Sequence, residues 1–248
     1  MLGGVARERI ADMLRTLQAT PPPEPDHVPV LLVAYADLLD CAADNPDGRA
    51  AHGAGTLLHE HLLSWLPLWL ARVEAVGTPP YDQWAVLVAE VLRARVDDAP
   101  EPDVVSSHLQ AAPPLDDPRA IDDEPRDQDA RGRPAGAGRA LVAQLLVPVR
   151  TGMILTGDDL RRASLELGVP GCIVERRYVL EQLLGQGTAA VLRWLADHAV
   201  TTTSEAWSSW RPLLPATATW WTQRAEATAT LLEDLADEAA AASVIPIG

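Results

Sequence analysis

A chain of 248 residues can hold one large or two small domains with apolar cores of their own. Its formal net charge of −15 disfavours nonspecific binding to nucleic acid, which needs cationic side chains to replace the counterions of phosphates, and favours a cationic partner. The two cysteines, Cys41 and Cys172, fit no metal-ligand spacing and indicate reduced thiols in the cytoplasm, while the longest apolar run, Val28 to Ala36, is too short for stable insertion in a membrane.

The first 96 residues are predicted to form a bundle of helices. Apolar residues recur three and four positions apart in four segments, namely 5–18, 28–42, 54–76 and a segment that begins at Tyr81. Pro67 lies inside the third segment, where an interior proline removes one backbone hydrogen bond and predicts a kink. Each segment has a broad apolar side, so none is expected to be stable without the others.

Residues 97–137 differ in composition from the segments on both sides. Acidic residues and prolines dominate, and the apolar residues are isolated, so this segment is expected to bury too little surface to offset its ordering entropy. We therefore predict a flexible acidic linker. An acidic lid or tail that mimics an anionic surface is the alternative.

Helical patterns resume in residues 138–248, the predicted C-terminal helical region. Thr156-Gly157-Asp158-Asp159 is typical of a capping box, in which the threonine oxygen accepts from the third helical amide and the last aspartate bonds back. Further helices are predicted at about 173–184, 189–199 and 216–242. No segment alternates apolar and polar residues with period two, so the chain is predicted to be all-α.

Residues 155–184 are predicted to form a helix, a tight turn and a second helix, an arrangement also found in helix-turn-helix proteins. The second helix carries Arg176 and Arg177, which would suit DNA, but also Glu175 and Glu181. A helix-turn-helix transcription regulator is therefore the alternative function. Plain helix packing and the acidity of the chain are the arguments against it, and we expect no nucleic acid among the partners.

Two short stretches are the candidates for a binding site. Asp26-His27 lies between Pro25 and Pro29 at the start of a helix, where the carboxylate either caps that helix or receives a cationic peptide. His61 and Trp65 lie one helical turn apart, either in the core or at the edge of a groove. No metal site is expected, because His59 and His61 would point about 200° apart on a helix. Motifs for a nucleophile elbow, a phosphate loop or a dinucleotide fold are lacking, so we expect neither catalysis nor a cofactor.

These stretches resemble the TorD/DmsD/NarJ family of redox-enzyme maturation chaperones. The matching elements are Glu24-Pro25-Asp26-His27-Val28-Pro29-Val30-Leu31-Leu32, then His61-Leu62-Leu63-Ser64-Trp65-Leu66-Pro67, and then Pro80-Tyr81 before an amphipathic helix. The resemblance implies an all-helical, cytoplasmic, non-enzymatic chaperone. Its partner would be the twin-arginine signal peptide or the body of a molybdenum-cofactor oxidoreductase, held during cofactor loading before export.

The resemblance also implies the residues of a peptide site. Asp26 and His27 would line its pocket, His61, Trp65 and Tyr81 would support it, and Tyr35 on the helix after Asp26-His27 belongs to the same expected set. The match covers about residues 10–96, which resembles the later half of the family's domain, so residues 1–96 lack the family's first helices. Either the natural start lies upstream of Met1, or segment 141–235 replaces those helices, or a second chain supplies them in a domain-swapped homodimer instead of a monomer.

Overall fold

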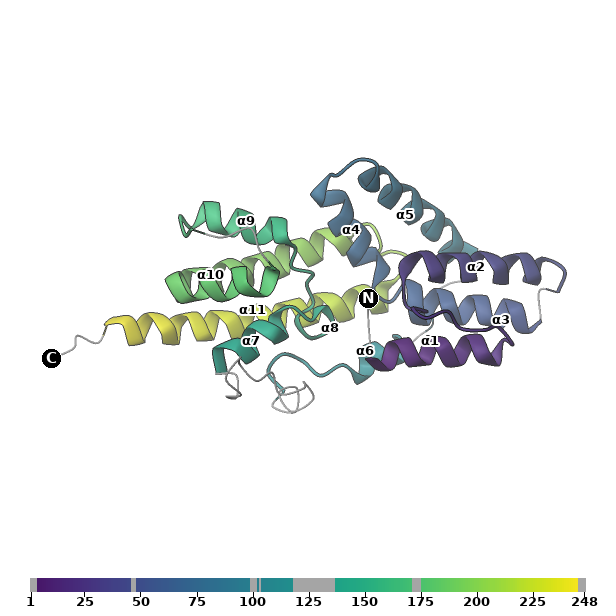
Figure 1. Cartoon of the computed structure of the whole chain (residues 1–248), viewed down its shortest axis with the longest axis horizontal. Helices are drawn as coiled ribbons and strands as arrows, with labels where there is room; N and C mark the ends of the chain where they lie inside the picture. Colours follow the sequence, from purple (N-terminus) through teal and green to yellow (C-terminus); the bar gives the residue numbers. More distant parts are fainter. Residues whose placement is uncertain are drawn as a thin grey trace.

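The computed structural model describes residues 4–45, 48–98, 102, 104–117, 137–170 and 175–244. Every regular element in these ranges is a helix, which confirms the all-α prediction (Figure 1). None of the described helices has the length and apolar composition needed to cross a membrane. In chain order the elements are α1 (Gly4–Thr16), α2 (Val28–Ala43), α3 (Arg49–Thr56), the π-helix η1 (Leu57–Leu62), α4 (Leu66–Val76), α5 (Tyr81–Asp98), α6 (Ser107–Ala111), α7 (Ala137–Leu145), α8 (Pro148–Thr151), α9 (Gly157–Glu166), α10 (Arg176–Ser208) and α11 (Pro215–Val244).

The two longest helices, α10 and α11, form an antiparallel pair that extends along the molecule. The short connection at 209–214 brings them side by side, as is usual for neighbouring antiparallel helices. Figure 1 shows the first helices of the chain gathered at one end of this pair and α7 and α9 at the other. The pair therefore contributes to both ends of the molecule.

One hydrophobic core lies at the end formed by α1 to α6. It includes Ile10, Leu31 and Leu62, and also Trp207, Trp210 and Trp221 from the region where α10 passes into α11. Trp207 and Trp221 stack with ring centroids 6.4 Å apart, and the Trp221 Nε1 donates to the Ser64 carbonyl at 2.8 Å. The core of the first 96 residues is thus completed by residues 206–221 of the same chain.

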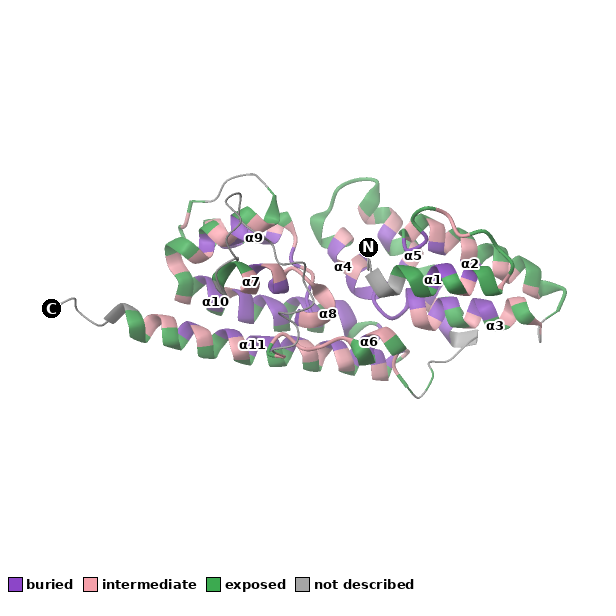
Figure 2. Ribbon diagram, turned by 60° about the horizontal axis from the view of Figure 1, so that its bottom comes forward, coloured by how far each residue is buried: buried purple, intermediate pink, exposed green. Residues whose placement is uncertain are grey.

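A second hydrophobic core lies at the other end, among α7, α9, α10 and α11. Its buried members include Leu145, Leu160, Leu195 and Leu232, all at most 1% exposed. Figure 2 shows how burial follows the sides of α10 and α11 that face the other helices, whereas their opposite sides are exposed. The chain therefore has two cores that share one helical pair.

The expected kink at Pro67 is instead a break between helices. The predicted helix 54–76 is divided into α3, η1 and α4, and Pro67 lies in the first turn of α4. A proline is well accommodated there, because the first amides of a helix have no partner within the helix. Leu66, Pro67 and Leu68 are buried. The position of the break is therefore set both by the start of a helix at Pro67 and by the burial of its first residues.

The two predicted helices 173–184 and 189–199 correspond to the two parts of α10, which meet at a kink. α10 continues to Ser208 and bends at Gly187, whose φ of −152° and ψ of 54° are not helical. Glycine lowers the cost of such a backbone, and the apolar pattern on both sides stays in register with the same core. Residues 173 and 174, where the prediction placed the helix start, lie outside the described residues.

Part of the segment expected to be a flexible linker is folded against the first core. Residues 104–117 contain α6, and Leu109 is 0% exposed within that core. The Arg224 side chain on α11 donates to the Ala112 carbonyl at 3.1 Å. A single well-placed leucine, with hydrogen bonds at both ends of the segment, holds it in place despite its polar composition. Residues 118–136 of the expected linker lie outside the described residues.

Candidate functional site

The six residues predicted to form a peptide site are divided between the interior and the surface. Asp26 is 1% exposed, and Tyr35, His61 and Trp65 are 6–7% exposed. His27 is exposed as the residue before α2 and caps it with no side-chain hydrogen bond, and Tyr81 is 63% exposed at the start of α5. The structure thus buries four of the six in the described fold, where a bound peptide would not touch them directly.

Trp65 is a core residue that begins a row of aromatic rings. Its Nε1 donates to the His61 carbonyl at 2.7 Å, which fixes the ring above the π-helix. The Trp65 and Trp69 centroids lie 6.4 Å apart and those of Trp69 and Trp84 lie 6.0 Å apart, both edge to face. The row therefore leads from the core through α4 to α5, and Trp69 and Trp84 are only partly buried.

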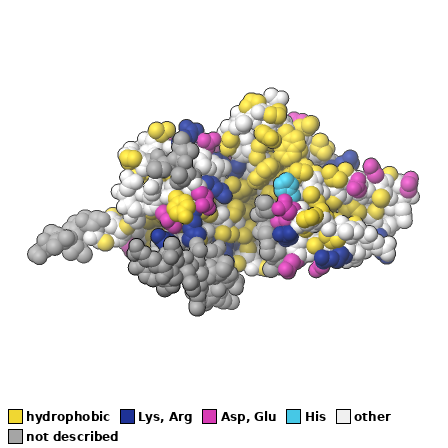
Figure 3. All heavy atoms as spheres, viewed as in Figure 1, with side chains coloured by type: hydrophobic (Ala, Val, Ile, Leu, Met, Phe, Trp, Pro, Cys, Tyr) yellow, Lys and Arg dark blue, Asp and Glu magenta, His cyan; other side chains and the backbone are white. Residues whose placement is uncertain are grey.

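The outer side of α5 is apolar, although its inner side already packs against the core. Ala85, Ala89, Leu92 and Val96 form the buried side. The adjoining side, which we call the α5 apolar face, consists of Tyr81, Trp84, Leu87, Val88 and Val91 at three- and four-residue spacing, with Trp84 and Val88 partly buried against the core. Within it Leu87 is 58% and Val91 52% exposed. Figure 3 shows a broad area of hydrophobic side chains over α4, α5 and the start of α2.

The sequence pattern predicted a helix with a broad apolar side from Tyr81 onward and missed that part of this side is exposed. The signal was available: residues 84–96 carry apolar side chains on more than one side of the helix, and alanines occupy the side that packs most closely. A helix that is apolar on two sides has either two buried faces or one buried face and one surface for a partner.

A polar cluster joins η1 to α1 and α6. The Glu60 Oε2 accepts from both the Ser107 amide and the Ser107 hydroxyl at 2.9 Å, and the Arg9 guanidinium donates to that hydroxyl at 3.1 Å. His61 and His108 lie in the same cluster. Burial lowers the pKa of His108 to about 4, with further lowering by His61 and Arg9 and opposition from Glu60. Burial likewise lowers the pKa of His61, again against the effect of Glu60.

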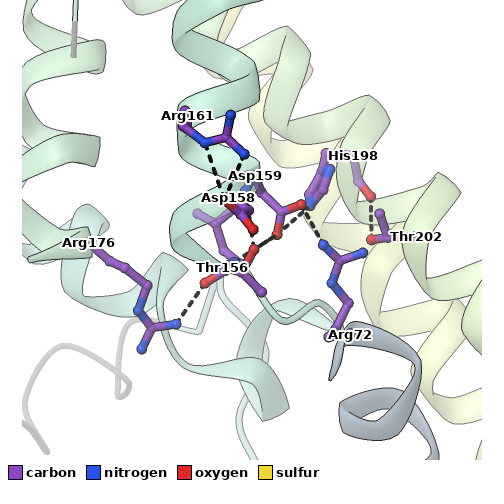
Figure 4. Close-up of polar contacts among 9 residues, drawn as sticks. Arg72, Thr156, Asp158, Asp159, Arg161, Arg176, His198 and Thr202 are labelled. Atoms are coloured by element: carbon purple, nitrogen blue, oxygen red, sulfur yellow. Dashed lines mark hydrogen bonds and ion pairs between the residues drawn. The ribbon is translucent and has the colours of Figure 1, made fainter. Parts of the chain in front are cut away.

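A buried ionic network connects the two ends of the molecule around Asp159 (Figure 4). Arg72 of α4 donates to one Asp159 oxygen. The other oxygen accepts from the Thr156 amide at 2.8 Å and the Thr156 hydroxyl at 2.5 Å, and lies 3.6 Å from the His198 Nε2. Burial acts to raise the pKa of Asp159, but the nearby His198 and the hydrogen bonds from Thr156 outweigh it and hold that pKa well below its usual value.

The predicted capping box at the start of α9 is present, since Thr156 and Asp159 bond to each other's backbone amides. Its contact with Arg72 was not predictable from local sequence, because 87 residues separate the two partners. Asp159 is 0% exposed and Arg72 is 8% exposed. The network has the features of a structural ion pair, because no open surface reaches the carboxylate.

The two arginines of the helix-turn-helix alternative are engaged within the chain. The Arg176 guanidinium donates to the Leu155 carbonyl at 2.7 Å, and Arg177 forms an ion pair with Glu181 at 3.5 Å. Tyr178 between these positions is 57% exposed. In the described residues of α9 and α10, both arginines are thus used for packing of these helices, and residues 171–174 between them lie outside the described residues.

Across the described ranges, no three His, Cys, Asp or Glu side chains come together in a group able to hold a metal ion. Cys41 is an exposed free thiol, and Cys172 lies outside the described residues. Searches with family models, among curated proteins and among solved structures found no match to this chain.

Proposed function

We propose that this protein is a chaperone that binds an apolar, arginine-bearing segment of a client protein, and that the α5 apolar face is the contact surface. By the resemblance described above, the client segment is the twin-arginine signal peptide or the body of a molybdenum-cofactor oxidoreductase. The observation that carries the proposal is the exposure of Tyr81, Leu87 and Val91 on a helix whose adjoining side already packs in the core.

Apolar contacts on this face supply the affinity. Burying an exposed leucine or valine against a peptide contributes roughly 1.5–3 kcal/mol per side chain. Trp84 adds aromatic area and is held in place by Trp69, so its ring loses little conformational freedom on binding. An amphipathic helix laid against such a face would present apolar residues at three- and four-residue spacing.

Charge supports a basic client. The net charge of −15 attracts a cationic segment at long range, and Glu90 is exposed on α5 itself. Acidic side chains bind the arginine guanidinium in a charge-assisted way, so they favour a twin-arginine segment over a neutral one. The predicted residues Asp26, Tyr35, His61 and Trp65 then act beneath the surface, as part of the core that supports α4 and α5.

A titration with a synthetic twin-arginine peptide tests the proposal. Leu87→Ser with Val91→Ser should weaken binding at least tenfold, because two exposed apolar contacts are lost without disturbing the buried side of α5. The matched control is Leu165→Ser on α9, whose side chain is 73% exposed far along the chain, and it should bind as the parent does.

Two further results separate the parts of the proposal. A peptide with both arginines replaced by glutamine should bind more weakly at low salt and lose that difference at high salt. If the parent binds no such peptide, the chaperone function is rejected. If it binds and the α5 variant binds equally well, the function stands and the α5 apolar face is the wrong surface.

A further inference from the structure

We infer that residues 106–112 form an acid-sensitive latch that closes over η1 at neutral pH and opens as His61 and His108 take up protons. We call these residues the α6 strap. The inference is independent of the proposed chaperone function, because the hydrogen bonds that hold this segment come from η1, α1 and α11 and not from the α5 apolar face.

The strap is held by a small number of contacts from three elements. Ser107 bonds to Glu60 of η1 through both its amide and its hydroxyl, and Arg9 of α1 bonds to the same hydroxyl. Arg224 of α11 bonds to the Ala112 carbonyl at the far end. Between these points Leu109 is the buried apolar anchor, at 0% exposure. A five-residue helix has little stability of its own, so these contacts decide whether the strap is closed.

His108 of the strap and His61 of η1 beneath it are in a setting that disfavours the protonated ring. His61 is 6% exposed, and its Nδ1 is buried without a hydrogen-bond acceptor; the Nε2 of His108 is also buried without one. A protonated imidazole has two donors to satisfy, so each ring would gain an unpaired donor on protonation.

The charges that face these two rings also favour the neutral imidazole. Arg9 and the other histidine repel a proton on His108, and Glu60 alone attracts it, while its carboxylate is already used by Ser107. Beyond the strap, Asp116 acts on Arg224 and not on His108. Burial and like charge thus both oppose protonation while the strap is closed.

The direction of the pH effect follows from linkage. In the open strap His108 is solvated and titrates near its ordinary value of about 6.5. In the closed strap its pKa is about 4. Protons therefore bind the open form preferentially, and lowering the pH from 7.4 to 5.0 should raise the open-to-closed ratio about 25-fold through His108 alone, with His61 adding to this.

Hydrogen exchange of the full chain at pH 7.4 and 5.0 tests the inference, with rates corrected for the intrinsic pH dependence of exchange. The amides of the α6 strap should lose protection by about 25-fold or more at pH 5.0, while those around Leu92 in α5 stay more protected than the strap at both pH values. Such a result means local opening rather than global unfolding.

Variants identify the titrating group. His108→Gln keeps a polar side chain that binds no proton. In this variant the slope of log protection of the strap against pH should be smaller than in the parent by about one proton. His52→Gln is the matched control, since His52 is exposed and should leave the parent slope unchanged.

Two results would overturn the latch. One is strap protection in the parent that does not change between the two pH values. The other is an equal loss of protection in His108→Gln and the parent. Should His108→Gln fold poorly, the measurement on the parent still decides, together with the titration of its imidazoles by NMR, which must show two histidines with pKa values well below 6.5.

Discussion

Gly152 marks the closest approach between the chain after α8 and the backbone of α11. Its φ of +76° is in the left-handed region, and a Cβ built on it would lie 2.4 Å from the Ala225 amide nitrogen. The Thr203 hydroxyl donates to the Gly152 carbonyl at 2.7 Å, so the turn is also tied to α10. Both its backbone conformation and its surroundings therefore exclude a side chain.

We predict that Gly152→Ala lowers the free energy of unfolding by about 3 kcal/mol or more, from overpacking against a rigid helix backbone together with left-handed strain. Gly168→Ala is the control for strain alone, because Gly168 has a φ of +64° and no neighbouring atom within 4 Å. It should cost only about 1 kcal/mol. Urea denaturation of both variants measures the difference, and equal losses would show that the contact with Ala225 contributes nothing.

Local rules of sequence were sufficient for features that involve neighbouring residues and failed for those that involve distant ones. The capping box at Thr156 and Asp159 was predictable because it spans four residues. The second partner of Asp159, Arg72, was not, and neither was the burial of Asp26 and His61, which depends on helices distant in the sequence. A histidine and a tryptophan one turn apart indicate a shared face of a helix but do not say whether that face is covered.

At the scale of helices, periodicity located the elements well and their boundaries less well. The segments 5–18, 28–42 and 216–242 correspond closely to α1, α2 and α11. One error lies at Pro67, which starts a helix rather than bending one, whereas the predicted break between residues 184 and 189 is present as the kink at Gly187. Both residues weaken a helix locally, and only the packing on either side determines which outcome follows.

The α6 strap is the case in which composition was misleading. Its flanking sequence is polar and proline-rich, and the rule that such segments bury too little surface is an average over many residues. Leu109 is buried in the core of α1 to α5, and hydrogen bonds with Glu60 and Arg224 hold the segment on either side of it.

We predict that Leu109→Ala lowers the free energy of unfolding by about 3 kcal/mol at pH 7.4, the typical cost of the cavity left by a fully buried leucine. Val104→Ala, in the same segment with its side chain 63% exposed, should change it by less than about 0.5 kcal/mol. Thermal and urea unfolding monitored by circular dichroism give both values. No loss in Leu109→Ala would mean that the segment does not contribute to the core in solution.

At the scale of the molecule, the two hydrophobic cores do not correspond to the two regions on either side of residues 97–137. Trp207, Trp210 and Trp221 belong to the core of the first region, although they come more than a hundred residues later. A later part of the same chain therefore completes the core of the first region. A helix pair shared by both cores also means that neither core is complete without it.

The contact between Arg72 and Asp159 joins α4, in the first half of the chain, to α9 and α10 around the second core. Two charges at most 8% exposed stabilise each other only as a pair, because either one alone would be a buried charge without compensation. Since the folded pKa of Asp159 lies below its ordinary value, this stabilisation is fully present above about pH 4 and is lost as the pH falls further. It is therefore constant over the pH range in which the α6 strap titrates.

We predict that Arg72→Met lowers the free energy of unfolding by about 3–5 kcal/mol, because Asp159 remains ionised and buried. Adding Asp159→Asn to Arg72→Met should restore part of this loss, since the amide carbonyl can still accept from Thr156 without carrying a charge. The double-mutant cycle should then give a coupling energy of about 2 kcal/mol or more between the two positions. Additive losses would contradict a direct ion pair.

The ion pair of Arg72 with Asp159 connects the two ends of a molecule whose cores share α10 and α11. We therefore predict that the parent unfolds in one transition, and that hydrogen exchange of amides in α2 and in α7 reports the same free energy. Arg72→Met should instead allow α9 to exchange at a lower free energy than α2.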